Sequence, residues 1–112
     1  MRIILWFALA LLAGLVQAQS PARFSFAIVG DAPYNDFEET VFAQMLEEIN
    51  QQDLAFVVHV GDIKSGRSPC SDELFAQRLQ QFQSVRHPFI FVPGDNEWTD
   101  CHRSGADPLE RL

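Results

Sequence analysis

Three short apolar runs divide this chain, and none of them alternates cleanly between apolar and polar residues. They span residues 24–29, 54–60 and 89–92 and are rich in Phe, Val and Ile. Runs of this length and composition are typical of strands that are buried on both faces of a sheet. The pattern therefore predicts three buried strands.

Between these runs, apolar residues recur every three or four positions, as on one face of a helix. Residues 35–50, "NDFEETVFAQMLEEIN", form the first such segment, in which Asp36 and Glu39 predict a capping box. Residues 71–85, "SDELFAQRLQQFQSV", form the second, with Ser71 suited to be its N-cap. The apolar faces comprise Val41, Phe42, Met45, Leu46 and Ile49 in the first segment, and Leu74, Phe75, Leu79 and Phe82 in the second.

The resulting β-α-β-α-β order predicts an α/β fold with a parallel sheet. Parallel strands joined by right-handed crossovers all run in the same direction, so their carboxyl ends lie at one edge of the sheet. A Gly-Asp pair follows each run, at positions 30–31, 61–62 and 94–95. We therefore expect Asp31, Asp62 and Asp95 to lie at the edge where open α/β sheets bind ligands, with the glycines allowing a sharp turn after each strand.

The last six residues, "DPLERL", carry the start signals of another helix. Asp107 is suited to be the N-cap, Pro108 the first helical residue and Glu110 the third. Leu112 ends the chain within the first turn of that helix. We therefore interpret residues 19–112 as part of a larger domain.

Residues 1–18 have the features of a secretory signal peptide. Arg2 precedes the apolar run of residues 3–16, and Val16 and Ala18 place small residues where a signal peptidase reads them. A membrane anchor is the alternative, but this run is shorter than the ~20 residues that span a bilayer. We expect cleavage after Ala18, no membrane span in the mature chain and an exported protein, periplasmic or secreted.

The mature chain is acidic. The formal net charge of the whole chain is -7, and removing residues 1–18, whose only charged residue is Arg2, changes it from -7 to -8. Binding to the phosphate backbone of nucleic acids depends on Lys and Arg, so we expect no partner of that kind. The negative charge is better suited to binding cations.

Export also favours a disulfide between the two cysteines. Cys70 follows the second Gly-Asp pair by a short loop and Cys101 follows the third, so neighbouring strands would bring both to one end of the sheet. We predict a Cys70–Cys101 disulfide. A zinc site of Cys70, Cys101 and His102 is the alternative, although the spacing matches no common zinc signature.

Three carboxylates at one edge of a sheet suggest a metal site. They repel one another by about 1 kcal/mol or more per pair unless a cation compensates. Oxygen ligands suit Mg²⁺, Mn²⁺ and Ca²⁺, and sites that also contain histidine admit Zn²⁺ and Fe. A single Gly-Asp pair is explained more simply as turn chemistry. Three pairs after three similar runs favour a divalent metal site.

The three segments "GDAPY", "VGDIKSG" and "PGDNEW" resemble the calcineurin-like metallophosphoesterase family. The family pattern has Asp-x-His after the first strand, Gly-Asp after the second and Gly-Asn-His-Glu/Asp after the third. The likeness covers roughly residues 24–100 and the amino-terminal half of the family's catalytic domain, an α/β sandwich. It implies two divalent metal ions (Mn, Fe, Zn or Mg) that bind a phosphate ester and activate water for its hydrolysis.

The resemblance also implies roles for individual residues. Asp31 looks like a ligand of the first metal, Asp62 like the carboxylate that bridges both, and Asp95 like a ligand in place of the family's asparagine. Two residues depart from the pattern. Pro33 stands where the first motif has histidine, which removes a nitrogen ligand. Asn96 stands at the histidine that resembles a general acid or phosphate contact; an amide cannot deliver a proton near neutral pH, but it can hydrogen-bond a phosphate oxygen.

Cationic loop residues near the Gly-Asp pairs offer further phosphate contacts. Lys64, Arg67 and Arg103 can each bind a phosphate oxygen, and the alternative is that they are solvated loop charges.

Three other side chains are more simply explained by packing or exposure. We expect His59 to pack in the core rather than bind a metal, since it lies inside an apolar run. His102 is expected to be a solvated loop residue, and Trp98 to cover the core rather than stack on a substrate.

Two functions are consistent with these features. The first is a metal-dependent hydrolase of phosphomonoesters or phosphodiesters, which we expect to be incomplete and inactive in these 112 residues alone, and whose partner is a small phosphate-ester molecule. The second is a non-catalytic exported module that binds metal or phosphate on the same scaffold. The departures at Pro33 and Asn96 keep the second function open.

Overall fold

The computed structural model describes residues 23–111. The expected signal peptide, residues 1–18, and its cleavage after Ala18 lie outside these residues. Within residues 23–111, the helices are too short or too polar to cross a membrane.

Three strands form a parallel sheet in the order β1-β2-β3. They are β1 (Ala27–Val29), β2 (Val57–His59) and β3 (Phe89–Phe91), and the register aligns Val29 with His59 and His59 with Phe91. The predicted α/β fold with a parallel sheet is confirmed. Each strand is shorter than its apolar run. Regular ladder pairs cover only part of each run, and single backbone hydrogen bonds continue beyond the strand ends.

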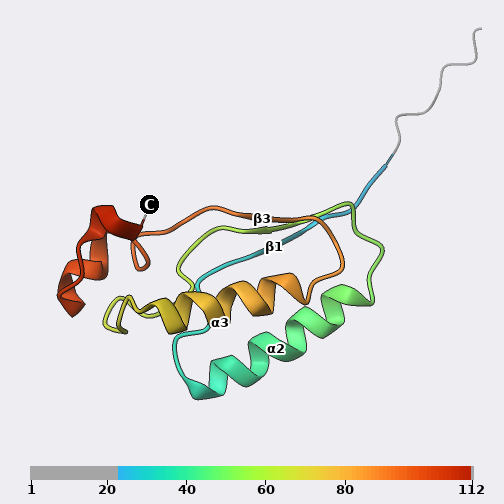
Figure 1. The fold of residues 1–112 in the computed structure, drawn as a ribbon. Coiled ribbons are helices and arrows are strands. Elements are labelled where there is room, and N and C mark those ends of the chain that lie inside the picture. Colours follow the sequence, from blue (N-terminus) through green and yellow to red (C-terminus); the bar gives the residue numbers. More distant parts are fainter. Residues whose placement is uncertain (1–22, 112) are drawn as a thin grey trace, which may run out of the picture.

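Two helices cover one face of the sheet. They are α2 (Asp36–Asn50) and α3 (Asp72–Gln83), and Figure 1 shows both on the same side. Because the strands follow one another in sheet order, right-handed crossovers place both helices on that side. The core between helices and sheet contains Phe42, Leu46, Ile49, Val57 and Val85.

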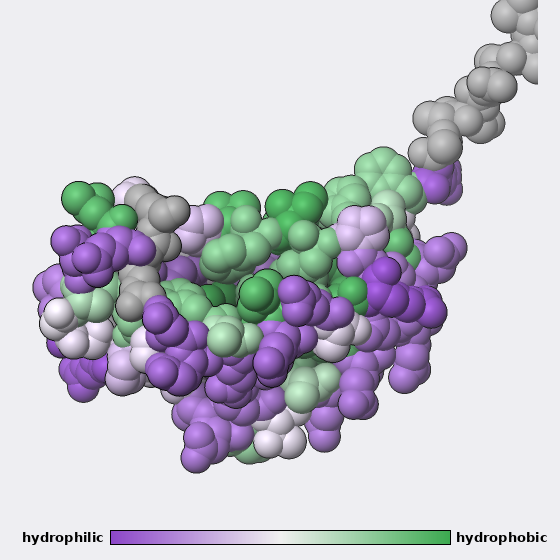
Figure 2. Space-filling model, in the orientation of Figure 1, coloured by the Kyte–Doolittle hydropathy of each residue, from purple (hydrophilic) through white to green (hydrophobic). Residues whose placement is uncertain are grey.

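The other face of the sheet carries apolar side chains that remain exposed. Ala27 and Val29 pack against the core, so their neighbours Phe26 and Ile28 point the other way, with exposed fractions of 47% and 61%. Figure 2 shows apolar side chains gathered along the sheet side of the molecule. The face of the sheet that the helices cover is buried, as expected. Among residues 23–111 the opposite face stays exposed, so the expectation that the strands are buried on both faces is wrong for this part of the chain.

The N-cap of α2 is Asn35, so the predicted capping box of Asp36 with Glu39 is wrong by one position. The Asn35 side chain accepts a hydrogen bond from the Glu38 backbone N–H at 3.0 Å and donates one to the Glu38 carboxylate at 2.7 Å. This arrangement leaves Glu39 free to bind elsewhere. The predicted cap of α3 is confirmed, because Ser71 accepts from the Leu74 N–H at 3.3 Å.

Helix α3 does not bury the face that its apolar spacing predicts. Leu79 is 55% exposed, whereas Arg78 is only 3% exposed. The Arg78 guanidinium donates to the Ile63 carbonyl at 2.6 Å and pairs with Glu39 at 2.5 Å. These partners satisfy the buried cation, and the neighbouring Leu79 faces outward.

After β3 the chain forms two short 3-10 helices, η2 (Thr99–Ser104) and η3 (Pro108–Arg111). Asp107 caps η3 as predicted, accepting from the Leu109 N–H at 2.8 Å. The helix expected at this segment is present as the 3-10 helix η3.

Candidate functional site

Asp31 and Asp62 leave their strands with an unusual backbone conformation. Their φ angles are 56° and 59°, in the left-handed region that few non-glycine residues occupy and that Asp tolerates better than most. Of the two preceding glycines, only Gly61 has a positive φ, at 96°. The sharp turns are thus made largely by the aspartates themselves. Such conformations are concentrated at functional sites.

Glycine is required at two positions because the loops after β2 and β3 approach each other closely. A Cβ atom on Gly61 would overlap the backbone of Gly94, and one on Gly94 would overlap the carboxylate and backbone nitrogen of Asp62. The loop after β1 joins them, since the Asp31 N–H donates to the Gly61 carbonyl at 3.2 Å. All three loops therefore meet at the carboxyl edge, as the sequence predicts.

The Tyr34 hydroxyl lies where these loops meet. It donates to Asp31 Oδ1 at 3.1 Å and lies 3.5 Å from Asp62 Oδ2, and the Asn96 side-chain amide donates to it at 3.4 Å. Burial, reinforced by the Asp31 and Asp62 carboxylates, holds the pKa of Tyr34 well above its usual range. Sequence reasoning missed this residue. The available signal was its position three residues after Asp31, as the only tyrosine in the chain.

Asp62 is the most enclosed of the three predicted metal ligands. Its Oδ1 accepts from the Asn96 backbone N–H at 3.1 Å. Partial burial raises the pKa of Asp62; the Asn96 N–H opposes this effect, and the nearby negative charges of Asp95 and Glu97 add to it. Asp31 and Asp95 are more exposed. The structure therefore brings Asp62 close to Asp95 and, through the Tyr34 hydroxyl, to Asp31.

Glu97 binds the backbone of the loops that carry Asp62 and Asp95, and sequence reasoning missed this residue too. It is 3% exposed, and its carboxylate accepts three backbone N–H groups, from Gly94 at 2.7 Å, Asp62 at 3.0 Å and Ile63 at 3.3 Å. These bonds join the loops after β2 and β3 and fix the backbone on both sides of Asp62. The signal in the sequence was an acidic residue two positions after Asp95.

The three cationic loop residues are in different surroundings. Lys64 is 1% exposed, and its ammonium donates to the carbonyls of Ser65 and Ser68, both at 3.1 Å, so it is not a solvated loop charge. Burial lowers the pKa of Lys64, while the charges of Glu97 and Asp100 oppose this effect. Arg103 pairs with Asp100 at 2.5 Å, and Arg67 is exposed.

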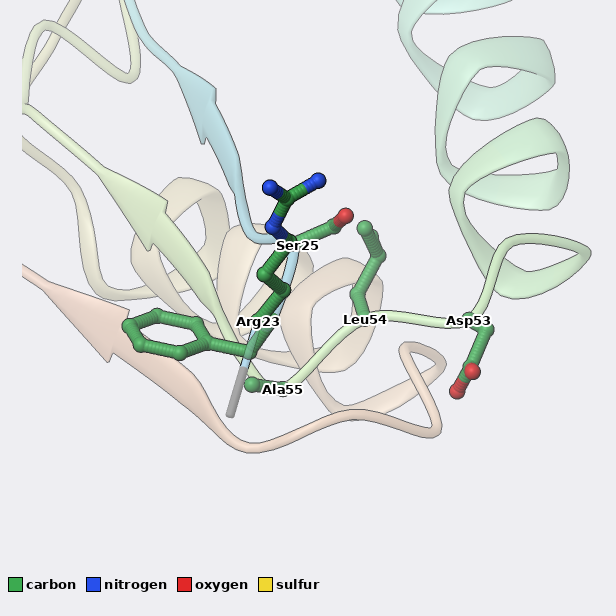
Figure 3. A pocket seen from close by; sticks show the side chains of 6 residues that line it. Arg23, Ser25, Asp53, Leu54 and Ala55 are labelled. Atoms are coloured by element: carbon green, nitrogen blue, oxygen red, sulfur yellow. The ribbon is translucent and has the colours of Figure 1, made fainter. Parts of the chain in front are cut away.

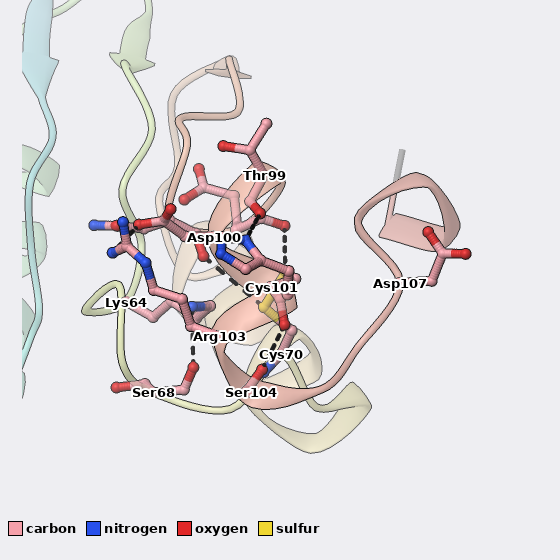
Figure 4. Close-up of a disulfide and its surroundings, with 12 residues drawn as sticks. Lys64, Ser68, Cys70, Thr99, Asp100, Cys101, Arg103, Ser104 and Asp107 are labelled. Carbon is pink, nitrogen blue, oxygen red and sulfur yellow. Dashed lines mark hydrogen bonds and ion pairs between the residues drawn. A yellow bond between two sulfur atoms is a disulfide. The ribbon is translucent and has the colours of Figure 1, made fainter.

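The predicted disulfide is present. Cys70 and Cys101 are bonded at 2.04 Å and nearly fully buried, which leaves no place for the alternative zinc site. Figure 4 shows the bond beside Lys64, Asp100 and Arg103. It ties the loop after β2 to η2, adjacent to the carboxylates.

His59 is packed in the core, as expected. It is fully buried among the rings of Phe42, Phe82, Phe89 and Phe91. Its Nδ1 accepts from the Gly61 N–H at 3.1 Å, and Nε2 makes no well-formed hydrogen bond to the described residues. Burial lowers the pKa of His59, so the ring is neutral.

His102 and Trp98 lie beside the third loop. His102 is exposed, as expected, but it lies in η2 rather than in a loop, and its Nδ1 is 2.7 Å from the Thr99 carbonyl oxygen. Trp98 is half-buried, and its backbone N–H donates to the Asp95 carbonyl at 3.2 Å.

The side-chain donors at the carboxyl edge are oxygen atoms, the ligand type that Mg²⁺, Mn²⁺ and Ca²⁺ prefer. Asp31, Asp62 and Asp95 make no ion pair with a Lys or Arg among residues 23–111. The side chains of His, Cys, Asp and Glu in this range form no preassembled group of three around a single ion position. Asp95 lies close enough to Asp62 to raise its pKa, and Asp31 contacts the same Tyr34 hydroxyl as Asp62 does.

A separate open hollow lies at the other end of the sheet. Figure 3 shows it lined by Arg23, Ser25, Asp53, Leu54 and Ala55, which precede β1 and β2. Asp53 is the one carboxylate among these lining residues. The hollow lies at the amino ends of the strands, and we therefore do not include it in the candidate site.

Comparisons with known proteins give no match to this chain, whether with protein-family models, with curated proteins or with solved structures.

Proposed function

We propose that this protein is a metal-dependent hydrolase of phosphate esters, similar to the calcineurin-like metallophosphoesterases, with its active site at the carboxyl edge of the sheet. One observation carries the proposal. Asp31 and Asp62 each follow a parallel strand in a left-handed conformation, and their carboxylates meet at one hydroxyl group. Turn chemistry alone gives no reason for two carboxylates to be held this close.

Asp31, Asp62 and Asp95 would hold two divalent ions (Mn, Fe, Zn or Mg), which supply Lewis acidity and an activated water when bound. The other residues of the site orient these ligands. The Asn96 N–H fixes Oδ1 of Asp62, and Glu97 fixes the backbone around it. The Asn96 side chain is available as a neutral donor for a phosphate oxygen of the small-molecule substrate.

The second candidate is a non-catalytic module that binds metal or phosphate. It is favoured by the surroundings of Pro33, which is fully buried and offers no side-chain ligand where the resembled motif has histidine. Asn96 likewise offers no proton for a leaving group. An exported location is proposed for either function, and a buried disulfide is in keeping with it.

The test is metal binding and hydrolysis by the protein after treatment with a chelator. Calorimetric titration with Mn²⁺ and Zn²⁺ measures binding, and activated aryl phosphomonoesters and phosphodiesters measure turnover. We expect Asp62→Asn to lower metal affinity and turnover by about 100-fold or more, since losing even an outer partner of a metal ligand costs ~10–100-fold. Asn tolerates the left-handed backbone, so the variant tests charge rather than strain.

Asp53→Asn is the matched control, because it removes a carboxylate at the opposite end of the sheet. Equal metal affinity of Asp62→Asn and wild type would refute the site. Tight metal and phosphate binding by the wild type without turnover would select the non-catalytic module instead.

A further inference from the structure

The neutral donors at the candidate site are better placed for an anion than the cations are. Lys64 is bonded to backbone carbonyls, and Arg103 is paired with Asp100. At the carboxylates themselves, the side-chain donor in contact is the Tyr34 hydroxyl, and the Asn96 side-chain amide lies 3.4 Å from that hydroxyl. Recognition of a phosphate oxygen at this point therefore falls to these two groups.

The backbone holds Tyr34 in a fixed position. Its N–H donates to Glu38 Oε2 at 2.7 Å, just before α2 begins. The preceding Pro33 is fully buried, and its carbonyl lies 3.5 Å from the Arg78 guanidinium. The tyrosine side chain thus projects from an anchored loop, and it is half-buried rather than enclosed.

The hydroxyl has one proton and two carboxylate neighbours. Asp31 accepts it at 3.1 Å, and Asp62 is farther away at 3.5 Å. Carboxylates that are neutralised by a cation compete less strongly for this proton. The proton is then available to an incoming acceptor, and the Asn96 amide can donate beside it.

We propose that Tyr34 is a substrate-binding residue whose hydroxyl donates a hydrogen bond to a phosphate oxygen, beside the Asn96 amide. This inference rests on the proposed function and adds a residue to it. The ligand class is a phosphate group, whether of an ester or of inorganic phosphate.

The test compares wild type, Tyr34→Phe and a control after loading with Mg²⁺. The control, Thr40→Val, removes a hydroxyl from the exposed side of α2, where it bonds the Asp36 carbonyl of its own helix. Calorimetry measures Mg²⁺ affinity and then the affinity for inorganic phosphate. We expect Tyr34→Phe to weaken phosphate binding about tenfold or more, as for the loss of a hydrogen bond to a charged group, and to leave Mg²⁺ affinity within about twofold.

A second measurement needs no variant. Because the chain has a single tyrosine, isotopically labelled tyrosine gives a carbon NMR signal of the phenol that reports on Tyr34 alone. We expect this signal to shift when phosphate is added to the Mg²⁺-loaded wild type. If Tyr34→Phe fails to fold, this shift decides the question.

Failure of this inference is distinguishable from failure of the proposed function. Wild type that binds phosphate with no shift of the tyrosine signal, or with the same affinity as Tyr34→Phe, overturns the role of Tyr34 and leaves the function standing. Loss of Mg²⁺ affinity in Tyr34→Phe also overturns it, because Tyr34 would then contribute to metal binding rather than to phosphate binding. Wild type that binds neither Mg²⁺ nor phosphate refutes the function itself.

Discussion

The guanidinium of Arg78 in α3 lies 2.5 Å from the carboxylate of Glu39 in α2. The same guanidinium donates to the Ile63 carbonyl, one residue after Asp62. One buried cation therefore links both helices to a loop of the candidate site. Since Arg78 is almost fully buried and Glu39 is partly exposed, the two partners should not contribute equally to stability.

We expect Arg78→Met to lower the free energy of unfolding by about 2–4 kcal/mol, because it leaves the Ile63 carbonyl and Glu39 without their partner. Glu39→Gln should cost about 1 kcal/mol, since Gln can still accept a hydrogen bond and water reaches this position. Denaturant unfolding measures both. Arg67→Gln, at an exposed arginine, is the control and should change little. A larger loss for Glu39→Gln than for Arg78→Met would contradict this assignment.

Reduction of the Cys70–Cys101 disulfide should destabilise the protein by about 3–4 kcal/mol in the chain-entropy model, because the two cysteines lie 31 residues apart and the bond closes the loop between them. The Cys70→Ser, Cys101→Ser double variant should show the same loss without reductant. Unfolding curves with and without reductant measure the effect. Free thiols titrated in denatured protein that was never exposed to reductant would show that the disulfide does not form.

Loss of protons from His59 on folding should make stability depend on pH. The pKa of His59 is lowered by burial, against the effects of the Ala32 backbone and the charges of Glu97 and Asp31, so the unfolded chain binds a proton that the folded chain excludes. The free energy of unfolding is therefore not reduced by His59 above its unfolded pKa of about 6.5. As pH falls below this value, the free energy of unfolding decreases by at most about 1.4 kcal/mol per pH unit.

The variant His59→Asn tests this dependence, because its amide oxygen can still accept from the Gly61 N–H. It should be less stable than wild type near neutral pH, since it leaves a cavity, but its stability should fall less steeply between about pH 7 and pH 5. His102→Asn, at an exposed histidine, is the control. Parallel slopes for wild type and His59→Asn would rule out His59 as the source.

Replacement of Glu97 by glutamine should loosen the loop that carries Asp62. Glutamine keeps the shape of the side chain, but its amide group is neutral and has one oxygen instead of two for three backbone N–H groups. We expect faster hydrogen exchange at the amides of Asp62, Ile63 and Gly94 and a stability loss of about 2–3 kcal/mol for Glu97→Gln. Glu73→Gln, on the exposed side of α3, should change neither. Unaltered exchange at all three amides would show that Glu97 does not hold this loop.

The sequence was sufficient to predict the elements whose physical cause is local. Apolar runs separated by helical periodicity indicated the order of strands and helices, and that order predicted a parallel sheet with Asp31, Asp62 and Asp95 at one edge. The disulfide followed from the same topology, because Cys70 and Cys101 leave neighbouring strands in the same direction. These inferences depend only on spacing and on the handedness of crossovers.

The side-chain partners of the site were decided by tertiary structure. Nothing near Arg78 in the sequence indicates that its charge is buried, because Glu39 and the Ile63 carbonyl reach it from other elements. Glu97 and Tyr34 were missed for the same reason, since their hydrogen bonds cross between loops that are distant along the chain. Local periodicity indicates which residues share a face of an element, but which face is buried, and which partners a polar group finds, depend on the elements that the fold brings together.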